Sequence, residues 1–214
     1  MTPKTKILLV DDHPLVREWL TKLINEEPDF EVCVQTGTAR EALGLIETLL
    51  PRIVVVDISL DGSSGLELIK DVKAIHPKVD MIVLSMHDEM LYAERAMRAG
   101  AAGYIMKREA TKKVLDAIRT VIQGGLYFSN AVNAMLAQKL VQGAGDQPAS
   151  IGSLSDRELD VFRLLGSDLD GPVIARELSI SLNTLRTHTK SIYAKLGVTS
   201  RRAAVSKGAE LNLH

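Results

Sequence analysis

Two kinds of hydrophobic pattern alternate along the first part of the chain. Short apolar runs rich in β-branched residues predict strands at residues 6–11, 30–35, 52–58, 80–86 and 102–107. Amphipathic stretches with helical spacing follow them at residues 15–27, 39–50, 65–76, 89–100 and 111–125. Because alternating strands and helices form parallel sheets covered on both faces, residues 5–125 predict a doubly wound α/β domain with a five-stranded parallel sheet.

The pattern changes after residue 125. Residues 130–141 predict one further amphipathic helix, and the small, polar stretch 142–153, which contains Gly and Pro, predicts a linker. We therefore place a linker with a possible helix at residues 126–151. Beyond it the apolar spacing is helical to the end, which predicts an all-α domain of four helices at residues 152–214.

Capping residues indicate where the C-terminal helices begin. Ser155 and Glu158 fit a capping box at the start of the first helix. Gly171 suits an N-cap, because the proline after it then takes the first position of a short second helix. Ser181 predicts the N-cap of a longer helix over residues 182–196.

Composition narrows the class of protein. The chain has 214 residues, 46% of them hydrophobic and 25% charged, which suits a globular protein of two domains. No apolar run approaches the ~20 residues of a membrane helix, and two acids directly after the first apolar run argue against a signal peptide. The single cysteine, Cys33, excludes a disulfide framework or a cysteine zinc site, and its apolar neighbours predict a buried, inert thiol. We expect a cytoplasmic protein without a membrane partner.

Charge is unevenly distributed, although the net charge is −1. From Ser150 to the end, nine Lys and Arg oppose seven Asp and Glu, a formal charge of +2, while the preceding residues carry −3. A modestly basic C-terminal domain is compatible with a nucleic-acid partner but is weak support for one.

Polar residues follow the predicted strands, where an open parallel sheet gathers its functional groups. Asp11 and Asp12 come after the first strand, Asp57 after the third, and Ser85 and Lys107 end the fourth and fifth. Two carboxylates ~4 Å apart repel by roughly 4 kcal/mol at a surface-like dielectric. Mg²⁺ relieves such repulsion and prefers oxygen ligands, so we expect these three acids to hold Mg²⁺.

Asp57 also has the position of a nucleophile. The apolar run before it holds it at the edge of the sheet, and attack on a phosphoryl group needs a carboxylate, a metal and donors for the equatorial oxygens. Ser85 and Lys107 suit the role of donors. Each acid alone is more simply explained as a helix cap or turn residue, and only their joint placement favours a site.

Residues 5–125 resemble the receiver domain of two-component response regulators, which has a flavodoxin-like fold. The resemblance implies a phosphoacceptor, an acidic pair, a switch hydroxyl, a switch aromatic and an invariant lysine, which correspond in order to Asp57, Asp11 with Asp12, Ser85, Tyr104 and Lys107. It also implies that the backbone carbonyl of Ser59 binds the metal. Asp61 departs from the family, which usually has proline there, and adds a negative charge near the site.

Residues 182–196 predict a helix with two distinct faces. Leu185, Ile192 and Leu196 recur near the helical period and predict its buried stripe. The opposite, exposed face is predicted to carry Arg186, Thr187 and Lys190. Arg and Lys pair with guanine or phosphate, and Thr meets a thymine methyl group. A short helix, a tight turn and a longer helix with exposed cations indicate a helix-turn-helix, although a solvated cationic face is the simpler reading of this helix alone.

Residues 152–214 resemble the LuxR-type helix-turn-helix of the NarL/FixJ regulators. The matching stretches, at residues 154–165 and 174–205, make residues 182–196 the recognition helix and the last helix a candidate dimer surface. Residues 170–175 depart from the family, which more often has Asn and charged residues before the Ile-Ala pair, so one backbone phosphate contact would be lost.

One histidine and one tryptophan need separate interpretation. His13 adjoins the acidic pair, but imidazole suits softer metals than Mg²⁺, and we interpret it as a surface loop residue. Trp19 is predicted to face the core from the first helix.

These features together predict a DNA-binding transcription regulator rather than an enzyme. A sensor histidine kinase would phosphorylate Asp57, and the phosphorylated protein would bind double-stranded DNA as a homodimer. A phosphatase of the haloacid dehalogenase type is one alternative, but it needs a second Asp two residues after its nucleophile, where this chain has Ser59. A DNA-binding regulator driven by a protein partner is the other alternative, and intact Asp57, Ser85 and Lys107 argue against it.

Overall fold

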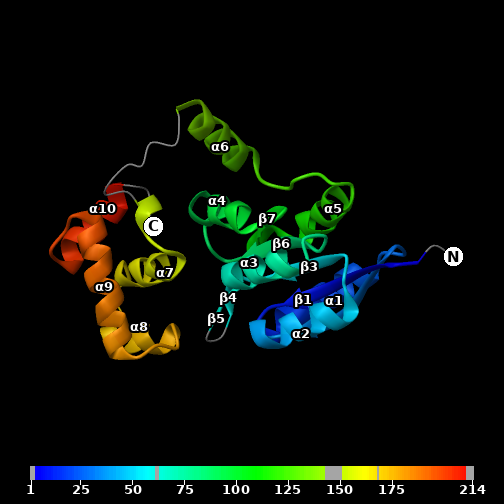
Figure 1. Ribbon diagram of the computed structural model, residues 1–214, viewed down its shortest axis with the longest axis horizontal. Coiled ribbons are helices and arrows are strands. Elements are labelled where there is room, and N and C mark those ends of the chain that lie inside the picture. The colour runs from blue at the N-terminus through cyan, green and yellow to red at the C-terminus, as the bar shows by residue number, and fades with distance from the viewer. Residues whose placement is uncertain (1–2, 61–62, 143–150, 168, 211–214) are drawn as a thin grey trace. The chain divides into compact units, whose positions relative to one another are not determined.

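The structure is a computed structural model that describes residues 3–60, 63–142, 151–167 and 169–210. The chain divides into two compact units, Met1–Gln142 and Gly143–His214 (Figure 1). Each unit has its own hydrophobic core, the first built on a sheet and the second, in its described residues, on helices.

The first unit contains a five-stranded parallel sheet, which confirms the prediction. Its strands lie in the order β2-β1-β3-β6-β7. Their bounds are Thr5–Val10 for β1, Phe30–Thr36 for β2, Ile53–Val56 for β3, Asp80–Ser85 for β6 and Gly103–Met106 for β7. All four residues of the central β3 are buried, as its apolar run predicts. The order reverses at β1 and β3, so their carboxyl ends form the crevice in which such sheets bind ligands.

Five helices connect and cover these strands. They are α1 Pro14–Asn25, α2 Ala39–Leu49, α3 Gly65–Ile75, α4 Glu89–Ala99 and α5 Ala110–Ile122. The apolar stripes of α1 and α5 share one core with alternate residues of β1, β3, β6 and β7. Helix α3 packs beside both α2 and α4. The predicted doubly wound arrangement is confirmed.

Trp19 does not face this core, and the prediction for it was wrong. The residue is 37% exposed, whereas Leu20 and Ile24 of the same helix are buried. Val16 and Leu23 pack against the core from the edges of that stripe. The face of α1 that meets the sheet is therefore rotated away from Trp19.

A short hairpin follows β3 that the sequence pattern did not predict. Strands β4 (Ser59–Leu60) and β5 (Ser63–Ser64) pair in antiparallel fashion before α3 begins. The departure at Asp61 falls between them, outside the described residues.

The possible helix of the linker region is present as α6, Asn130–Gln142, and it packs against α4 of the first unit. The segment before it pairs with the edge strand β7. The N–H of Tyr104 donates to the carbonyl of Tyr127 at 2.9 Å, and the N–H of Tyr127 donates to the carbonyl of Ala102 at 2.8 Å. An ion pair joins Lys139 to Glu94 of α4. Domain boundaries at residues 125/126 and 151/152 stay predictions, and residues 143–150 lie outside the described residues.

The second unit contains the four predicted helices. They are α7 Asp156–Leu165, α8 Gly171–Glu177, α9 Leu182–Leu196 and α10 Arg201–Glu210, preceded by a short 3₁₀ turn, Ile151–Ser153. The capping box of Ser155 and Glu158 is confirmed, as is the N-cap of Ser181 on α9. The N-cap of α8 is Asp170 instead of Gly171, which is already the first helical residue.

The core of the second unit forms where α9 packs against α7 and α8. Leu185, Ile192 and Leu196 are buried there, which confirms the predicted stripe. Arg201, at the start of α10, donates hydrogen bonds to the carbonyls of Leu165, Ser167 and Leu169 after α7, at 2.9, 2.5 and 2.9 Å. The bond to Leu165 satisfies a carbonyl that the end of α7 leaves without a partner, and the other two tie the following loop to α10.

Two structural findings concern the hydropathy of the helices and the environment of Cys33. No helix among the described residues is both long and apolar enough to span a membrane. Cys33 is half-buried rather than fully buried, and its Sγ donates to the carbonyl of Ile7 at 3.4 Å. Burial raises the pKa of this thiol, so the thiolate, which is the reactive form, is disfavoured.

Candidate functional site

Asp57 lies directly after β3, at the carboxyl edge of the sheet. Its side chain is buried, and its backbone N–H donates to the carbonyl of Val10 at 2.8 Å. Gly65, the first residue of α3, packs against the Asp57 backbone so closely that a Cβ at this position would lie 1.9 Å from the Asp57 carbonyl oxygen. Only glycine fits there, a requirement that the sequence pattern did not reveal.

Lys107 forms ion pairs with two acids at this edge. Its Nζ lies 2.7 Å from Oδ2 of Asp57 and 2.7 Å from Oδ2 of Asp11. The lysine starts the 3₁₀ turn Lys107–Glu109 after β7, so residues from three strand ends meet here. Two carboxylates and one ammonium carry a net negative charge in a largely water-excluded place.

The protonation of these groups reflects that setting. Burial raises the pKa of Asp57 to about 6, and the charge of Lys107 only partly offsets this. Burial alone would lower the pKa of Lys107, but the carboxylates of Asp57 and Asp11 outweigh it and raise that pKa. At neutral pH Lys107 is therefore an ammonium and Asp57 a carboxylate with a strongly basic character for its type.

Asp12 and His13 complete the acidic cluster. Single ligand atoms of Asp11, Asp12, His13 and Asp57 all lie within 4.8 Å of one another. His13 is exposed, as predicted, but its Nδ1 lies 2.6 Å from Asp12 Oδ1 and 3.2 Å from Asp11 Oδ1. Asp11 Oδ2 and Asp12 Oδ1 are buried, and their partners among the described residues are the Lys107 ammonium and the His13 ring. Carboxylate oxygens at this spacing are suited to a hard cation.

Ser59, Ser85 and Tyr104 surround the same edge. The N–H of Ser59 donates to Asp57 Oδ1 at 3.3 Å. Ser85, at the end of β6, is fully buried. Tyr104 of β7 is also buried, and burial raises the pKa of its hydroxyl, which therefore stays protonated and able to donate.

His87 lies among these groups, although the sequence pattern did not single it out. Its ring is stacked on that of Tyr92 in α4, with centroids 4.7 Å apart and an angle of 20° between the planes. Its position two residues after Ser85 was the available signal, but nothing in the local pattern shows which way its ring points.

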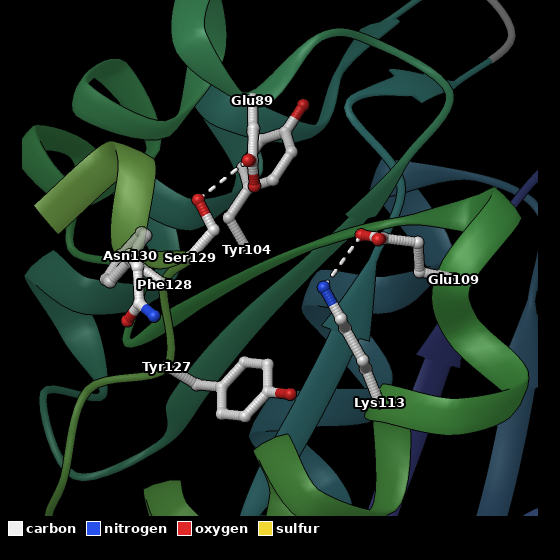
Figure 2. A pocket seen from close by; sticks show the side chains of 8 residues that line it. All are labelled: Glu89, Tyr104, Glu109, Lys113, Tyr127, Phe128, Ser129 and Asn130. Carbon is white, nitrogen blue, oxygen red and sulfur yellow. Dashed lines mark hydrogen bonds and ion pairs between the residues drawn. The ribbon is translucent and has the colours of Figure 1, made fainter.

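A separate cavity of about 310 Å³ is lined by Tyr104 and by residues of α4, α5 and the segment before α6 (Figure 2). Its walls are mainly polar. Ser129 donates to Glu89 at 2.7 Å, and Lys113 is paired with Glu109 at 3.0 Å. Because these charges already have partners, the cavity offers no free charged group comparable to the acidic cluster.

In the second unit, α9 presents Arg186, Thr187 and Lys190 to solvent, and all three are exposed. Thr187 Oγ1 donates to the carbonyl of Asn183 at 3.1 Å, whereas the two cations extend from the helix surface. The three side chains share one face, as the spacing predicts.

Glu158 of α7 holds α9 in place. Its buried carboxylate accepts from the N–H of Ser155 at 2.6 Å, from Ser191 Oγ at 2.5 Å and from Lys195 Nζ at 2.6 Å. Burial alone would raise the pKa of Glu158, but the bonds from Lys195, Ser191 and Ser155 outweigh it and lower the pKa to about 2. The sequence pattern identified Glu158 only as part of a capping box.

Two family models match the chain. The response regulator receiver domain matches residues 7–119, more than half of the chain. The luxR family of bacterial regulatory proteins matches residues 152–207. The chain belongs to the NarL/FixJ family of response regulators. Members of this family are DNA-binding transcription regulators and not enzymes.

Curated NarL/FixJ relatives align with almost the whole chain. The transcriptional regulatory protein MctR of Rhizobium johnstonii is 34% identical over 199 residues, which cover 92% of this chain and 90% of MctR. The nitrate/nitrite response regulator protein NarP of Escherichia coli is 33% identical over 199 residues, which cover 93% and 92%. RcsB from Salmonella enterica serovar Typhimurium, solved on a promoter with the phosphomimetic BeF₃⁻, shares the fold with a TM-score of 0.64, 23% identity, and coverage of 95% of this chain and 97% of RcsB.

The structure thus brings the predicted residues of each response-regulator domain together. Asp11, Asp12, Asp57, Ser59, Ser85, Tyr104 and Lys107 gather at one edge of the sheet. Their individual roles, and those of Arg186, Thr187 and Lys190 on α9, stay predictions.

Proposed function

We propose that Asp57 is the phosphoacceptor of this response regulator and that its phosphorylation controls DNA binding by α9. The observation that carries the proposal is the position of Lys107 Nζ, 2.7 Å from both Asp57 Oδ2 and Asp11 Oδ2 at the carboxyl edge of the sheet. A buried carboxylate paired with a fixed ammonium has both the nucleophile and a donor for phosphoryl oxygens.

The transfer takes its phosphoryl group from a phosphohistidine of a sensor kinase. An Asp57 carboxylate oxygen attacks phosphorus, the P–N bond breaks, the imidazole nitrogen keeps the electron pair and takes up a proton, and an acyl phosphate forms on Asp57. Lys107 stays protonated because of its raised pKa and donates to the new phosphoryl oxygens.

Mg²⁺ fits the acidic cluster. Asp11, Asp12 and Asp57, together with the backbone carbonyl of Ser59, would hold the ion. The carboxylate oxygens of the three acids lie close enough together to bind one ion. When bound, the ion offsets the charge of the attacking carboxylate and of the phosphoryl oxygens. Without it, three carboxylates face one ammonium.

Ser85 and Tyr104 act as the switch. A phosphoryl group on Asp57 is a new acceptor for the buried Ser85 hydroxyl, whereas the free carboxylate is not within a hydrogen bond of it in the described contacts. A switch moves only by such differential affinity between two states. Tyr104 follows Ser85, since both are hydrogen-bonded to the same backbone at His87.

Arg186, Thr187 and Lys190 contact DNA from the exposed face of α9, with the helix in the major groove. The receiver domain spans residues 5–125 and the DNA-binding domain residues 152–214, with the linker between them. The phosphorylated protein binds double-stranded DNA as a homodimer and acts in the cytoplasm together with its sensor histidine kinase.

The experiment combines phosphoryl uptake with DNA affinity. The full chain and its Asp57→Asn and Lys107→Ala variants are treated with acetyl phosphate and Mg²⁺, and label on the protein and DNA affinity are measured. Asp57→Asn should take up no label. Lys107→Ala should still be labelled but should lose most of the gain in DNA affinity. The coupling free energy between two sites is typically about 1–3 kcal/mol, so we expect this gain to be roughly 5- to 150-fold in the wild type.

Matched controls are available on the surface. Asp71 of α3 and Lys112 of α5 are exposed, and Asp71→Asn and Lys112→Ala should behave like the wild type. Label on Asp57→Asn equal to that of the wild type would exclude Asp57 as phosphoacceptor. A labelled wild type without any gain in DNA affinity would favour the alternative in which a protein partner drives the regulator.

A further inference from the structure

His87 contacts Ser59, Ser85, Tyr92 and Tyr104 around the phosphoacceptor, through hydrogen bonds of its ring and backbone and through ring stacking. It is buried, with 8% of its surface exposed, and lies between the end of β6 and the start of α4. None of the roles proposed for Asp57, Mg²⁺ or the switch uses its side chain. A buried imidazole at this place can link the loop after Asp57 to helix α4.

The ring joins two loops that are far apart in sequence. His87 Nε2 lies 2.7 Å from Ser59 Oγ, a hydrogen bond across 28 positions of the chain. Ser59 in turn donates its N–H to Asp57 Oδ1 at 3.3 Å. A face of the ring stacks on the ring of Tyr92, the fourth residue of α4. One side chain therefore connects the loop after the phosphoacceptor to a helix on the face of the sheet.

The backbone of His87 is bonded to both predicted switch side chains. Its N–H donates to Ser85 Oγ at 3.2 Å, and its carbonyl accepts from the Tyr104 hydroxyl at 3.0 Å. These two bonds lie on either side of one Cα. When Ser85 moves toward a phosphoryl group on Asp57, the His87 N–H moves with it, and the carbonyl that holds Tyr104 must follow.

How far that motion travels depends on the ring. With its Nε2 bonded to Ser59 and its face on Tyr92, the imidazole has little freedom to rotate independently of either partner. A rigid ring passes a displacement of the backbone on to α4. A ring without the bond to Ser59 rotates instead and absorbs the displacement.

We propose that His87 is a positioning residue of the switch, whose imidazole ties the loop after Asp57 to α4 while its backbone couples Ser85 to Tyr104. The inference rests on the proposed function, because it takes Asp57 as the phosphoacceptor. It adds that the response of α4 depends on the hydrogen bond between Ser59 and His87.

The test is a double-mutant cycle in the full chain with Ser59→Ala, His87→Phe and both together. Phenylalanine keeps a ring for Tyr92 but has no Nε2, and alanine removes the Ser59 hydroxyl but keeps its backbone carbonyl. Three quantities are measured with Mg²⁺: label from acetyl phosphate, the change in hydrogen exchange of residues 89–99 on adding beryllofluoride, and the gain in DNA affinity on phosphorylation. His76→Phe, at the end of α3, is the matched control.

We expect each single variant, in its phosphorylated form, to lose about fivefold of the DNA gain. This is the ~1 kcal/mol of a neutral hydrogen bond, converted at 1.4 kcal/mol per tenfold. The double variant should lose the same fivefold, because both changes remove one bond. The exchange response of α4 should shrink in all three variants and stay at the wild-type level in His76→Phe.

Losses that multiply to about 25-fold in the double variant would overturn the inference, because two independent structural defects behave in that way. A full α4 response in either single variant would overturn it too, and Ser59→Ala keeps the test valid if His87→Phe does not fold. In these cases normal labelling and DNA gain of the wild type leave the proposed function intact. A wild-type protein that takes up no label would overturn both the proposed function and the inference on His87.

Discussion

Two buried carboxylates, Asp57 in the first unit and Glu158 in the second, have opposite protonation preferences. Both are almost inaccessible, with 3% and 5% of the residue exposed. Yet the pKa of Asp57 is raised to about 6, and that of Glu158 is lowered to about 2. Burial pushes both upward, so the difference comes from what each carboxylate accepts.

Glu158 accepts short hydrogen bonds from a backbone N–H, a hydroxyl and an ammonium. Asp57 accepts one short bond from Lys107 and one long bond from the N–H of Ser59, and Asp11 shares the same lysine. A carboxylate that holds a helix in place is fully satisfied, whereas one that must react retains surplus negative charge for a cation and a phosphoryl group. This contrast distinguishes a structural acid from a functional one where burial alone cannot.

The first test displaces the backbone of Asp57 without changing the charge of its side chain. Gly65→Ala places a Cβ 1.9 Å from the Asp57 carbonyl oxygen, so the backbone must shift, and we expect a loss of about 3 kcal/mol or more in the free energy of unfolding. Gly44→Ala in α2 is the matched control, because a Cβ there has no atom within 4 Å and should stabilise the helix by up to about 1 kcal/mol. Urea unfolding measures both, and equal stability of the two variants would contradict this packing.

Removing the charge of Glu158 tests the satisfied side of the contrast. Its folded pKa of about 2 lies below the usual value of 4.5, so its stabilising effect is present above pH 4.5 and lost as the pH falls toward 2. Glu158→Gln should therefore cost about 3 kcal/mol at pH 7 and little near pH 2. Hydrogen exchange of α7 and α9 against pH measures this cost, with Glu177→Gln on the exposed face of α8 as control. A cost that did not depend on pH would mean that packing, not charge, keeps Glu158 in place.

Removing the charge of Asp57 should have the opposite sign. Its folded pKa of about 6 lies above the usual value of 3.8, so the carboxylate destabilises the fold increasingly from pH 3.8 to pH 6 and fully above that. Asp57→Asn in a chelator should stabilise the first unit by about 3 kcal/mol at pH 7 and by almost nothing below pH 4. Thermal unfolding at the two pH values measures the difference. A destabilised variant at pH 7 would show that Lys107 already satisfies Asp57.

The smallest expected effect belongs to a charge outside both buried sites. Arg186 is exposed on α9, so Arg186→Ala should leave stability unchanged, keep the response to phosphorylation and lose about 1–3 kcal/mol of specific DNA binding. Gel-shift titrations with and without phosphoryl donor measure these quantities. Lys195→Ala, which removes a partner of Glu158 instead, should lower the stability of the second unit as well. An equal loss of stability in Arg186→Ala would contradict its position on a free face.

Several features of the fold could be predicted because they depend on local pattern. The apolar run before Asp57 reports a strand buried on both faces, and the spacing of Leu185, Ile192 and Leu196 reports the inner face of α9. Ser181 marked the start of that helix, because a hydroxyl that caps free N–H groups acts within three residues of its own position. The edge of the sheet that carries the site followed as well, since parallel strands bring their carboxyl ends together.

What the sequence determined by itself is therefore the alternating strands and helices of the first domain, the four helices of the second, and the residue types gathered at the carboxyl edge of the sheet. Only the tertiary structure decided the orientation of side chains between elements: Trp19 turned partly to solvent, α6 packed on α4, and the ring of His87 placed between Ser59 and Tyr92. The same holds for Gly65 against Asp57 and for Ser191 and Lys195 on Glu158. Periodicity reports which face of an element is buried, but the partner on that face comes from another part of the chain, and packing at near-crystalline density selects it.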